Sequence, residues 1–316
     1  MHDFWPEGRQ YATQENQHFL SSRAGLEAAW RQQIILEGLA LRCDPTHALT
    51  VQLGDTVGVI PREECALGIR EGSTRDIAIL TCVGKAVSFV VTGFANGVPQ
   101  LSRRLAQERA LAQLLQCQLG DILPATVTHL EPYGAFVDIG CGVPSLLPLK
   151  TLSISRIPHP NCRFRSGQEI FCVVRQVMPE LGRVQLSHKE LLGTWSENAS
   201  HFEAGETVTG IIRSVMDYGI FVELTPNLAG LAEYREGVKV GQAAAVYIKN
   251  MIPERMKIKL VLVDAAENQA PPPPIRYFLG EDRLHIDRWL YSPSGCQKTV
   301  ESVFESESRL CSGCNT

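Results

Sequence analysis

The sequence lacks long hydrophobic runs, a strong excess of either charge, and a recognisable catalytic motif. No apolar stretch approaches the ~20 residues that a membrane-spanning helix needs, so no membrane partner is expected. Gly84-Lys85 has no upstream glycine at phosphate-loop spacing, and neither a His-x-x-x-His pair nor a paired Cys-x-x-Cys set occurs. We therefore predict that the chain is not an enzyme and that it uses no cofactor and no metal.

Cysteine is present but forms no pattern of disulfides. The ten cysteines are scattered, and Cys82 and Cys172 lie in strand-like apolar contexts where a free thiol acts as a small buried hydrophobe. Such usage fits a reducing compartment. Residues 1–17 also lack the basic segment and apolar core of a signal peptide, so a cytoplasmic location is expected.

The net charge of −4 is unevenly distributed. Residues 30–117 hold nine Lys/Arg against eight Asp/Glu, and residues 118–190 and 205–263 each hold seven against six. Residues 264–316 hold five against eight. Three weakly positive regions precede an acidic tail, which predicts modules of modest affinity for an acidic ligand that act in series.

The stretch from residue 119 to residue 189 has the pattern of a small closed barrel. Residues 126–140 alternate apolar and polar side chains around a turn at 131–134, which predicts a hairpin. Extended runs at 168–177 and 183–187 follow. Five short strands in about 70 residues are typical of an OB-fold.

Aromatic and basic side chains lie at the ends of these predicted strands. Tyr133 and Phe136 flank the hairpin turn, and Arg183 and Lys189 lie at the end of the last strand. Bases of a single-stranded nucleic acid stack on flat rings, while fixed cations hold its phosphates. These four residues are therefore predicted to bind RNA.

The same stretch carries a family resemblance. YGAFVDIG, the dipeptide Gly167-Gln168 and GRVQLSHK at residues 182–189 resemble the RNA-binding domain named after ribosomal protein S-one. Members of that family bind single-stranded RNA, commonly in translation initiation on the small ribosomal subunit or beside RNA-processing enzymes. The resemblance implies binding of single-stranded RNA or mRNA and, less firmly, contact with the small ribosomal subunit.

A second copy of the aromatic pair occurs in residues 205–264. Tyr218 and Phe221 occupy the positions of Tyr133 and Phe136, and Lys257 occupies the position of Arg183. One aromatic pair near a hairpin turn is as often core as binding site. Repetition of the pair with its cation favours binding.

The region 30–117 repeats the barrel pattern without the rings. Aligning residues 51–54 with 137–140 places Thr50 at the position of Phe136 and His47 at that of Tyr133. We predict a barrel that keeps its core and has lost most of its stacking surface. Arg103 and Arg104 follow it, either as phosphate contacts or on the solvated start of a connecting helix.

Two segments between the predicted barrel strands need separate interpretation. Residues 151–166 form a short basic insertion, which is either a phosphate-facing rim or a solvated loop. Trp195, in the second connector, is predicted to pack between barrels rather than to stack on a base. The basic side chains of the insertion are Arg156, His159, Arg163 and Arg165.

The two ends of the chain are less regular. Residues 1–20 have no clear period and are predicted to be a partly ordered arm, whereas residues 271–274 predict a stiff proline spacer. Residues 285–291 can form a short apolar face, and the last residues look disordered. Cys311 and Cys314 have the spacing of half a zinc site, with Cys296 and His285 as conceivable further ligands.

The sequence departs from the family at two supporting positions. The family's histidine after the third strand is replaced by Pro148 and Glu233, and its aspartate before the final basic residue by Pro179 and Pro253. These changes affect polar support of the aromatic pair and leave the pair itself intact.

We thus predict an all-β chain of three tandem five-stranded OB-fold barrels joined by short helices, with a proline-linked tail. The predicted function is non-catalytic binding of single-stranded RNA. The alternative is a scaffold whose barrels dock proteins. The predicted segments are an N-terminal arm and helix start at 1–29, a degenerate barrel at 30–117, RNA-binding barrels at 118–190 and 205–264, a connector at 191–204, and a linker and tail at 265–316.

Overall fold

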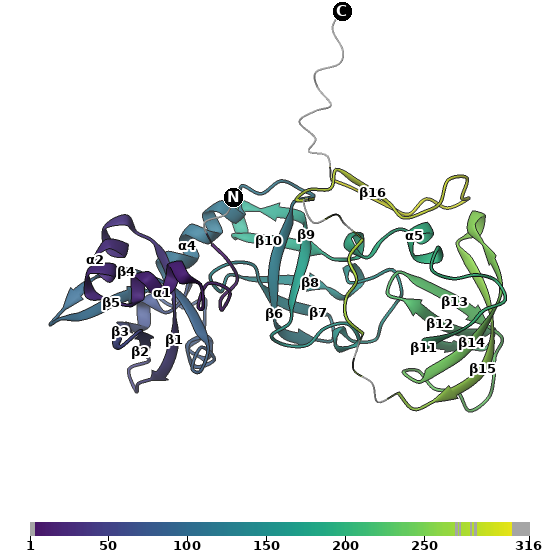
Figure 1. Cartoon of the computed structure of the whole chain (residues 1–316), viewed down its shortest axis with the longest axis horizontal. Helices are drawn as coiled ribbons and strands as arrows, with labels where there is room; N and C mark the ends of the chain where they lie inside the picture. The colour runs from purple at the N-terminus through teal and green to yellow at the C-terminus, as the bar shows by residue number, and fades with distance from the viewer. Residues whose placement is uncertain (1–3, 269–270, 272, 279, 281–282, 305–316) are drawn as a thin grey trace, which may run out of the picture.

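The computed structural model contains three closed five-stranded β-barrels, which lie in a row in chain order (Figure 1). It describes residues 4–268, 271, 273–278, 280 and 283–304. The predicted all-β architecture of tandem OB-fold barrels is confirmed. No helix within the described residues is long and apolar enough to cross a membrane.

The first barrel follows two helices. Ser22 caps the second of them by accepting the backbone N–H of Gly25 at 3.0 Å. The strand order is β1-β2-β3-β5-β4. The elements are α1 (Gln14–Leu20), α2 (Arg23–Gln32), β1 (Ile35–Cys43), β2 (Leu49–Leu53), β3 (Thr56–Ile60), η1 (Arg62–Glu64), α3 (Ile77–Leu80), β4 (Ala86–Ala95) and β5 (Val98–Ser102).

A helix connects the first barrel to the central one, whose strand order is β10-β8-β7-β6-β9. In β7 the inward-facing Ala135 and Val137 are buried while Phe136 between them points outward, which is the alternation that predicted the strand. The elements are α4 (Arg103–Leu114), β6 (Ile122–Glu131), β7 (Gly134–Asp138), β8 (Pro144–Pro148), η2 (Leu149–Thr151), η3 (Pro160–Cys162), β9 (Glu169–Met178), η4 (Pro179–Leu181) and β10 (Arg183–Ser187).

The third barrel has the strand order β11-β12-β13-β15-β14. Trp195 in the connector before it is 3% exposed and belongs to a core shared by the central and third barrels, so its predicted packing role is confirmed. The elements are η5 (Lys189–Leu192), α5 (Trp195–Ala199), β11 (Thr207–Met216), β12 (Gly219–Thr225), β13 (Leu228–Ala232), β14 (Ala243–Ile252), η6 (Pro253–Arg255) and β15 (Lys257–Ala266).

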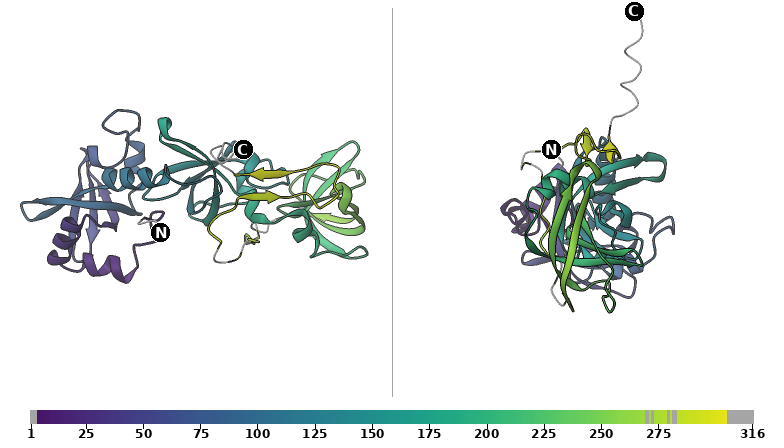
Figure 2. Two further views of the ribbon diagram at one scale, coloured as in Figure 1. Left: turned by 90° about the horizontal axis from the view of Figure 1, so that it is seen from above. Right: turned by 90° about the vertical axis from the view of Figure 1, so that its right-hand side faces the viewer.

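The described part of the tail packs back onto the barrels instead of extending from them. β16 (Arg288–Leu290) and β17 (Glu301–Val303) pair and lie over the junction of the central and third barrels (Figure 2). Ile286 and Trp289 are buried there, as expected of an apolar face, whereas Leu290 is exposed. The expectations for disorder at the last residues and for the Cys311–Cys314 half site lie outside the described residues.

The N-terminal arm is more ordered than the sequence suggested. Phe4 is buried in the core cluster of the central barrel, and Glu7 forms a two-bond ion pair with Arg103 at 2.7 and 2.8 Å. Arg103 is itself buried, so both expectations for it, a phosphate contact or a solvated helix start, are wrong. The arm thus ties the first barrel to the central one. Phe4 packs in the core of the central barrel, and Glu7 supplies the partner that the buried Arg103 requires.

Two further carboxylates complete this joint. Glu37 of β1 accepts backbone N–H bonds from Gly8 at 3.0 Å and Gln10 at 3.1 Å, and Asp138 of β7 accepts one from Glu7 at 2.7 Å. Burial, then repulsion by Glu7, raises the pKa of Glu37 to about 7. The same two causes raise the pKa of Asp138 above its ordinary range.

We expect the contribution of Glu37 to the stability of the protein to grow as the pH falls from about 8 to about 5. Because the pKa of Glu37 is about 7 when folded against an ordinary value of 4.5, the folded state binds the proton more tightly. The resulting stabilisation is complete below the ordinary value and is lost as pH rises through 7. Its limit is on the order of 3 kcal/mol.

Thermal unfolding across this pH range tests the prediction, with Glu37→Gln as the comparison. The glutamine resembles the protonated carboxyl, so the stability of the parent chain relative to the variant should rise as the pH falls through 7. Other titrating groups are common to both proteins, and their effects cancel in this difference. Parallel pH profiles for the two proteins would show that Glu37 does not titrate in this range.

Basic residues of the insertion between β8 and β9 divide into two groups. Arg163 is buried and pairs with Glu223 of β12, whose carboxylate also pairs with Arg213 of β11 at 2.9 Å. Neither the rim nor the solvated-loop interpretation holds for Arg163, because the insertion packs against the third barrel. Arg156 and Arg165 remain exposed.

Candidate nucleic-acid interface

The two predicted aromatic pairs have the same geometry. The ring centroids of Tyr133 and Phe136 are 6.1 Å apart with an interplanar angle of 89°, and those of Tyr218 and Phe221 are 6.1 Å apart at 86°. Tyr133 is 57% exposed and Tyr218 69%, while both phenylalanines are half-buried. Each barrel therefore presents an edge-to-face pair outward, with ring surface accessible to a base.

A glycine after each tyrosine explains why the pairs match. A Cβ atom on Gly134 would lie 2.5 Å from the carbonyl oxygen of Leu147, and one on Gly219 would lie 2.5 Å from that of Ala232. Only glycine allows the hairpin turn to approach the third strand this closely. The Tyr-Gly dipeptide thus places the tyrosine ring beside the phenylalanine that follows.

Strand register extends each pair into a row of outward side chains. The row crosses all five strands of a barrel. One strand lies between the phenylalanine and the last-strand member, so the two are about 10 Å apart. In the central barrel the row is His129, Phe136, Leu146, Gln185 and Gln176, and in the third barrel it is Ser214, Phe221, Leu231, Lys259 and Asn250.

The equivalent row of the first barrel carries no ring. Thr50 pairs with Arg42 and Val59 in the register that Phe136 has with its neighbours, which agrees with the sequence alignment. His47 lies near Asp76, with its Nδ1 3.4 Å from a carboxylate oxygen. This face therefore offers no pair of rings on which bases could stack.

Arg183 and Lys257 occupy equivalent places beside these rows. Each begins the last strand directly after a one-turn 3₁₀ helix and pairs with the last residue of the preceding strand. Both side chains are exposed. They lie on the same face as Gln185 and Lys259, two strand positions away from the phenylalanines. They can therefore contact the phosphates of a nucleic acid that crosses the barrel rather than the stacked base itself.

The structure adds one cation to the predicted set and places another away from its predicted neighbour. Lys259 lies in the row of the third barrel, and the sequence analysis did not predict it. It could have been found, because residues two apart in a strand, such as Lys257 and Lys259, point to the same face. Lys189 is not beside Arg183. Its ammonium lies 5.8 Å from the ring centroid of Trp289, and the residue lines a groove that also contains Tyr133.

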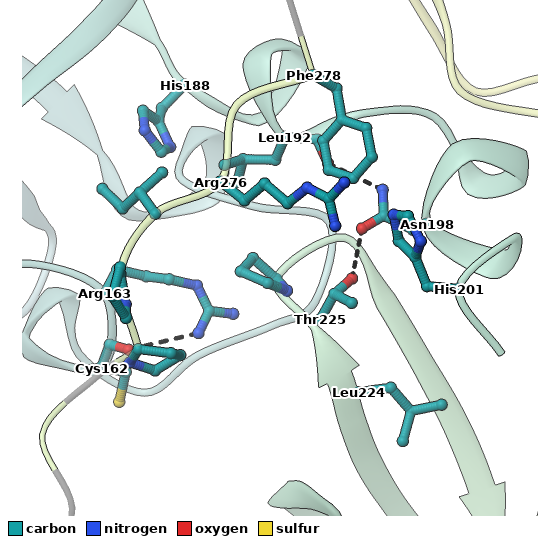
Figure 3. Close-up of a pocket in the computed structure, with 14 residues that line it drawn as sticks. Cys162, Arg163, His188, Leu192, Asn198, His201, Leu224, Thr225, Arg276 and Phe278 are labelled. Carbon is teal, nitrogen blue, oxygen red and sulfur yellow. Dashed lines mark hydrogen bonds between the residues drawn. The ribbon is translucent and has the colours of Figure 1, made fainter. Parts of the chain in front are cut away.

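A second hollow, of about 220 Å³, lies where the central barrel, the third barrel and the tail meet (Figure 3). His188 lines it and is held by the Leu152 carbonyl at 3.1 Å and the Tyr277 hydroxyl at 3.3 Å. Burial lowers the pKa of His188 to about 4, so it is neutral at pH 7. Arg163 here pairs with Glu223, and the guanidinium of Arg276 lies 5.2 Å from the ring centroid of Phe278. The hollow thus lies at the joint between the two barrels and the tail.

The described residues contain no cluster of three or more potential metal ligands. All described cysteines are free, and Cys82 and Cys172 are buried as expected. Burial raises the pKa of the Cys172 thiol, which makes it a poor nucleophile and a poor metal ligand.

Comparison with known proteins supports a family resemblance for the central barrel. Residues 116–189 match the model of the S1 RNA binding domain. The central barrel is thus similar to that domain. The resemblance to the S-one family that the sequence motifs suggested is thereby confirmed, and the S1 match covers the strands that carry Tyr133, Phe136 and Arg183.

Curated relatives extend the similarity beyond this S1 barrel. The small ribosomal subunit protein bS1 of Rhizobium meliloti is 26% identical over 237 residues, which are 69% of this chain and 41% of that protein. The bS1 homolog of Bacillus cereus is 31% identical over 212 residues, which are 65% and 53% of the two chains. The chain thus spans about half the length of these relatives.

Proposed function

We propose that this chain is a non-catalytic protein that binds single-stranded RNA, including mRNA, and acts in translation with the small ribosomal subunit. Support for RNA comes from the S1 RNA binding domain match. Support for the ribosome comes from relatives that are small ribosomal subunit proteins. The proposed location is the cytoplasm, where such a subunit would be met.

One observation carries the proposal: the same exposed ring pair recurs in two successive barrels with a cation at the same place. Packing inside a barrel would not require Tyr133 or Tyr218 to be more than half exposed. Stacking accepts every base, so we expect little preference among RNA sequences. The first barrel, which lacks the rings, contributes to RNA binding weakly or not at all.

The alternative is a scaffold that docks proteins. The salt dependence of the binding constant distinguishes such a scaffold from an RNA-binding protein. Association with a single strand releases counterions, so log K should fall with log salt concentration by about 0.7 for each phosphate neutralised. Docking through apolar contacts should respond far less. Titrating the chain with a short unstructured RNA at several KCl concentrations makes this distinction.

We expect Arg183→Ala and Lys257→Ala to flatten this salt dependence. Each variant removes one exposed cation beside a ring row, so each slope should become less steep by about 0.7. Affinity at low salt should fall as well, since fewer phosphates are held. The measurement is the dissociation constant as a function of KCl concentration.

Lys85→Ala is the matched control, because Lys85 is an exposed cation of the first barrel, whose equivalent row carries no ring. Its salt slope should equal that of the parent chain. If all three variants gave the parent slope, Arg183 and Lys257 would not be phosphate contacts.

A further inference from the structure

An open groove of about 590 Å³ lies beside the ring pair of the central barrel. It is lined by Tyr133, by η2 and by the beginning of the insertion. Lys189, a predicted RNA contact that lies away from the ring row, also lines this groove. The volume is in the range of small-ligand pockets and is sufficient for one nucleotide.

Three cations and no carboxylate line the groove. They are Lys150, Arg156 and Lys189, and none forms an ion pair within the described part of the chain. Lys150 and Arg156 are exposed, so their charges are available to a ligand. Clustered, unpaired cations attract phosphate and repel one another, which leaves this place favourable for an anion.

A buried hydroxyl points to a ligand independently of the charges. Ser155 lines the groove and is 8% exposed, and its Oγ has no hydrogen-bond partner within the described residues. Its backbone is fixed, because its N–H donates to the Pro226 carbonyl of the third barrel at 3.1 Å. A buried polar group without a partner costs about 1–3 kcal/mol, which a ligand hydrogen bond would offset.

We propose that this groove holds the nucleotide next to the one stacked on Tyr133, with its phosphates among Lys150, Arg156 and Lys189 and a polar atom on the Ser155 hydroxyl. The proposal rests on the RNA-binding function above and adds a subsite to it. It makes the two ring-bearing barrels unequal.

The third barrel has no corresponding insertion to build such a groove. Its third and fourth strands are joined by residues 233–242, against residues 149–168 in the central barrel. The shorter segment carries Arg235 and Lys239, and Arg235 is engaged by the Val263 carbonyl at 3.1 Å. The central barrel should therefore be the main anchor for the strand.

The test uses the full chain, an unstructured RNA of about twelve nucleotides, and the double variant Lys150→Ala/Arg156→Ala. Both side chains are exposed, so folding should be unaffected. We expect roughly tenfold weaker binding at moderate salt and a slope less steep by about 1.4, because two phosphates are no longer neutralised. Arg165→Ala is the control, because Arg165 is an exposed cation of the same insertion outside the groove.

If the double variant kept the RNA affinity and the salt slope of the parent chain, the proposed role of the groove would be wrong. The same conclusion would follow if Arg165→Ala lost as much affinity as the double variant. A parent chain that binds no RNA at all would instead refute the proposed function, so the two failures are distinguishable. Ser155→Ala should weaken binding severalfold at an unchanged slope, because the hydroxyl carries no charge. Parent affinity in this variant would overturn the seating of a nucleotide in the groove.

Discussion

Phe136→Ala and Phe221→Ala should each weaken binding of single-stranded RNA by about 1–3 kcal/mol, and the double variant by about 2–6 kcal/mol. Each change removes one ring of an outward pair while the inward core of its barrel stays in place. The losses should add because the two pairs belong to different barrels and are not in contact with each other. The corresponding drop in affinity is roughly thirtyfold or more for the double variant.

Fluorescence titration with a short RNA gives the affinities, and thermal unfolding shows that the variants remain folded. Tyr234→Ala is a suitable control, since Tyr234 is 54% exposed in the third barrel but lies outside the ring row. Unchanged binding in the double variant would remove the stacking surface as an explanation. A similar loss in Tyr234→Ala would indicate that any exposed ring suffices.

Local pattern allowed the barrels and their ring pairs to be predicted. Alternation along β7 and the Tyr-Gly turn are decided by residues close in sequence, and the repeat in β12 offered an internal check. The degenerate first barrel was visible for the same reason, because Thr50 aligns with Phe136 without a gap. Properties of this kind follow from strand geometry and turn chemistry.

Contacts between distant segments could not be predicted. Glu7 and Arg103 are 96 residues apart, and Arg163 and Glu223 are 60 apart. A single charged residue in a polar stretch gives no sign of a partner in another barrel, so surface exposure was the natural expectation. These ion pairs depend on how the barrels pack against one another, which the local sequence pattern does not specify.

The tail illustrates the same limit. Its Tyr277 hydroxyl accepts the backbone N–H of Phe171 at 3.0 Å, and its Tyr291 hydroxyl donates to the Asn227 carbonyl at 2.6 Å. These bonds fasten the tail to the central barrel and to the third. The two ring pairs are thereby held in one arrangement, which raises the effective concentration of the second pair once the first is bound.

This arrangement makes Glu223 the residue whose loss should destabilise the structure most. Glu223→Ala leaves Arg163 and Arg213 without their shared carboxylate at a buried junction. Breaking such a group by removing one partner typically costs about 3–5 kcal/mol, because an uncompensated charge stays buried. Glu180→Ala, which removes an exposed glutamate, should have little effect.

Because a chain of several barrels need not unfold in one step, hydrogen exchange is the better measurement. Exchange should quicken in the insertion and in β11 and β12, where the arginines and Glu223 lie, and the first barrel should keep its protection. Replacing all three by apolar residues, Arg163→Met, Arg213→Met and Glu223→Leu, should restore much of the stability, since no charge then remains buried.

RNA binding supplies a second readout. Glu223→Ala should lose the benefit of joining the two ring pairs while each barrel keeps its own rings, so long RNAs should be weakened more than short ones. If hydrogen-exchange protection in Glu223→Ala equalled that in Glu180→Ala, the junction would tolerate two unpaired arginines.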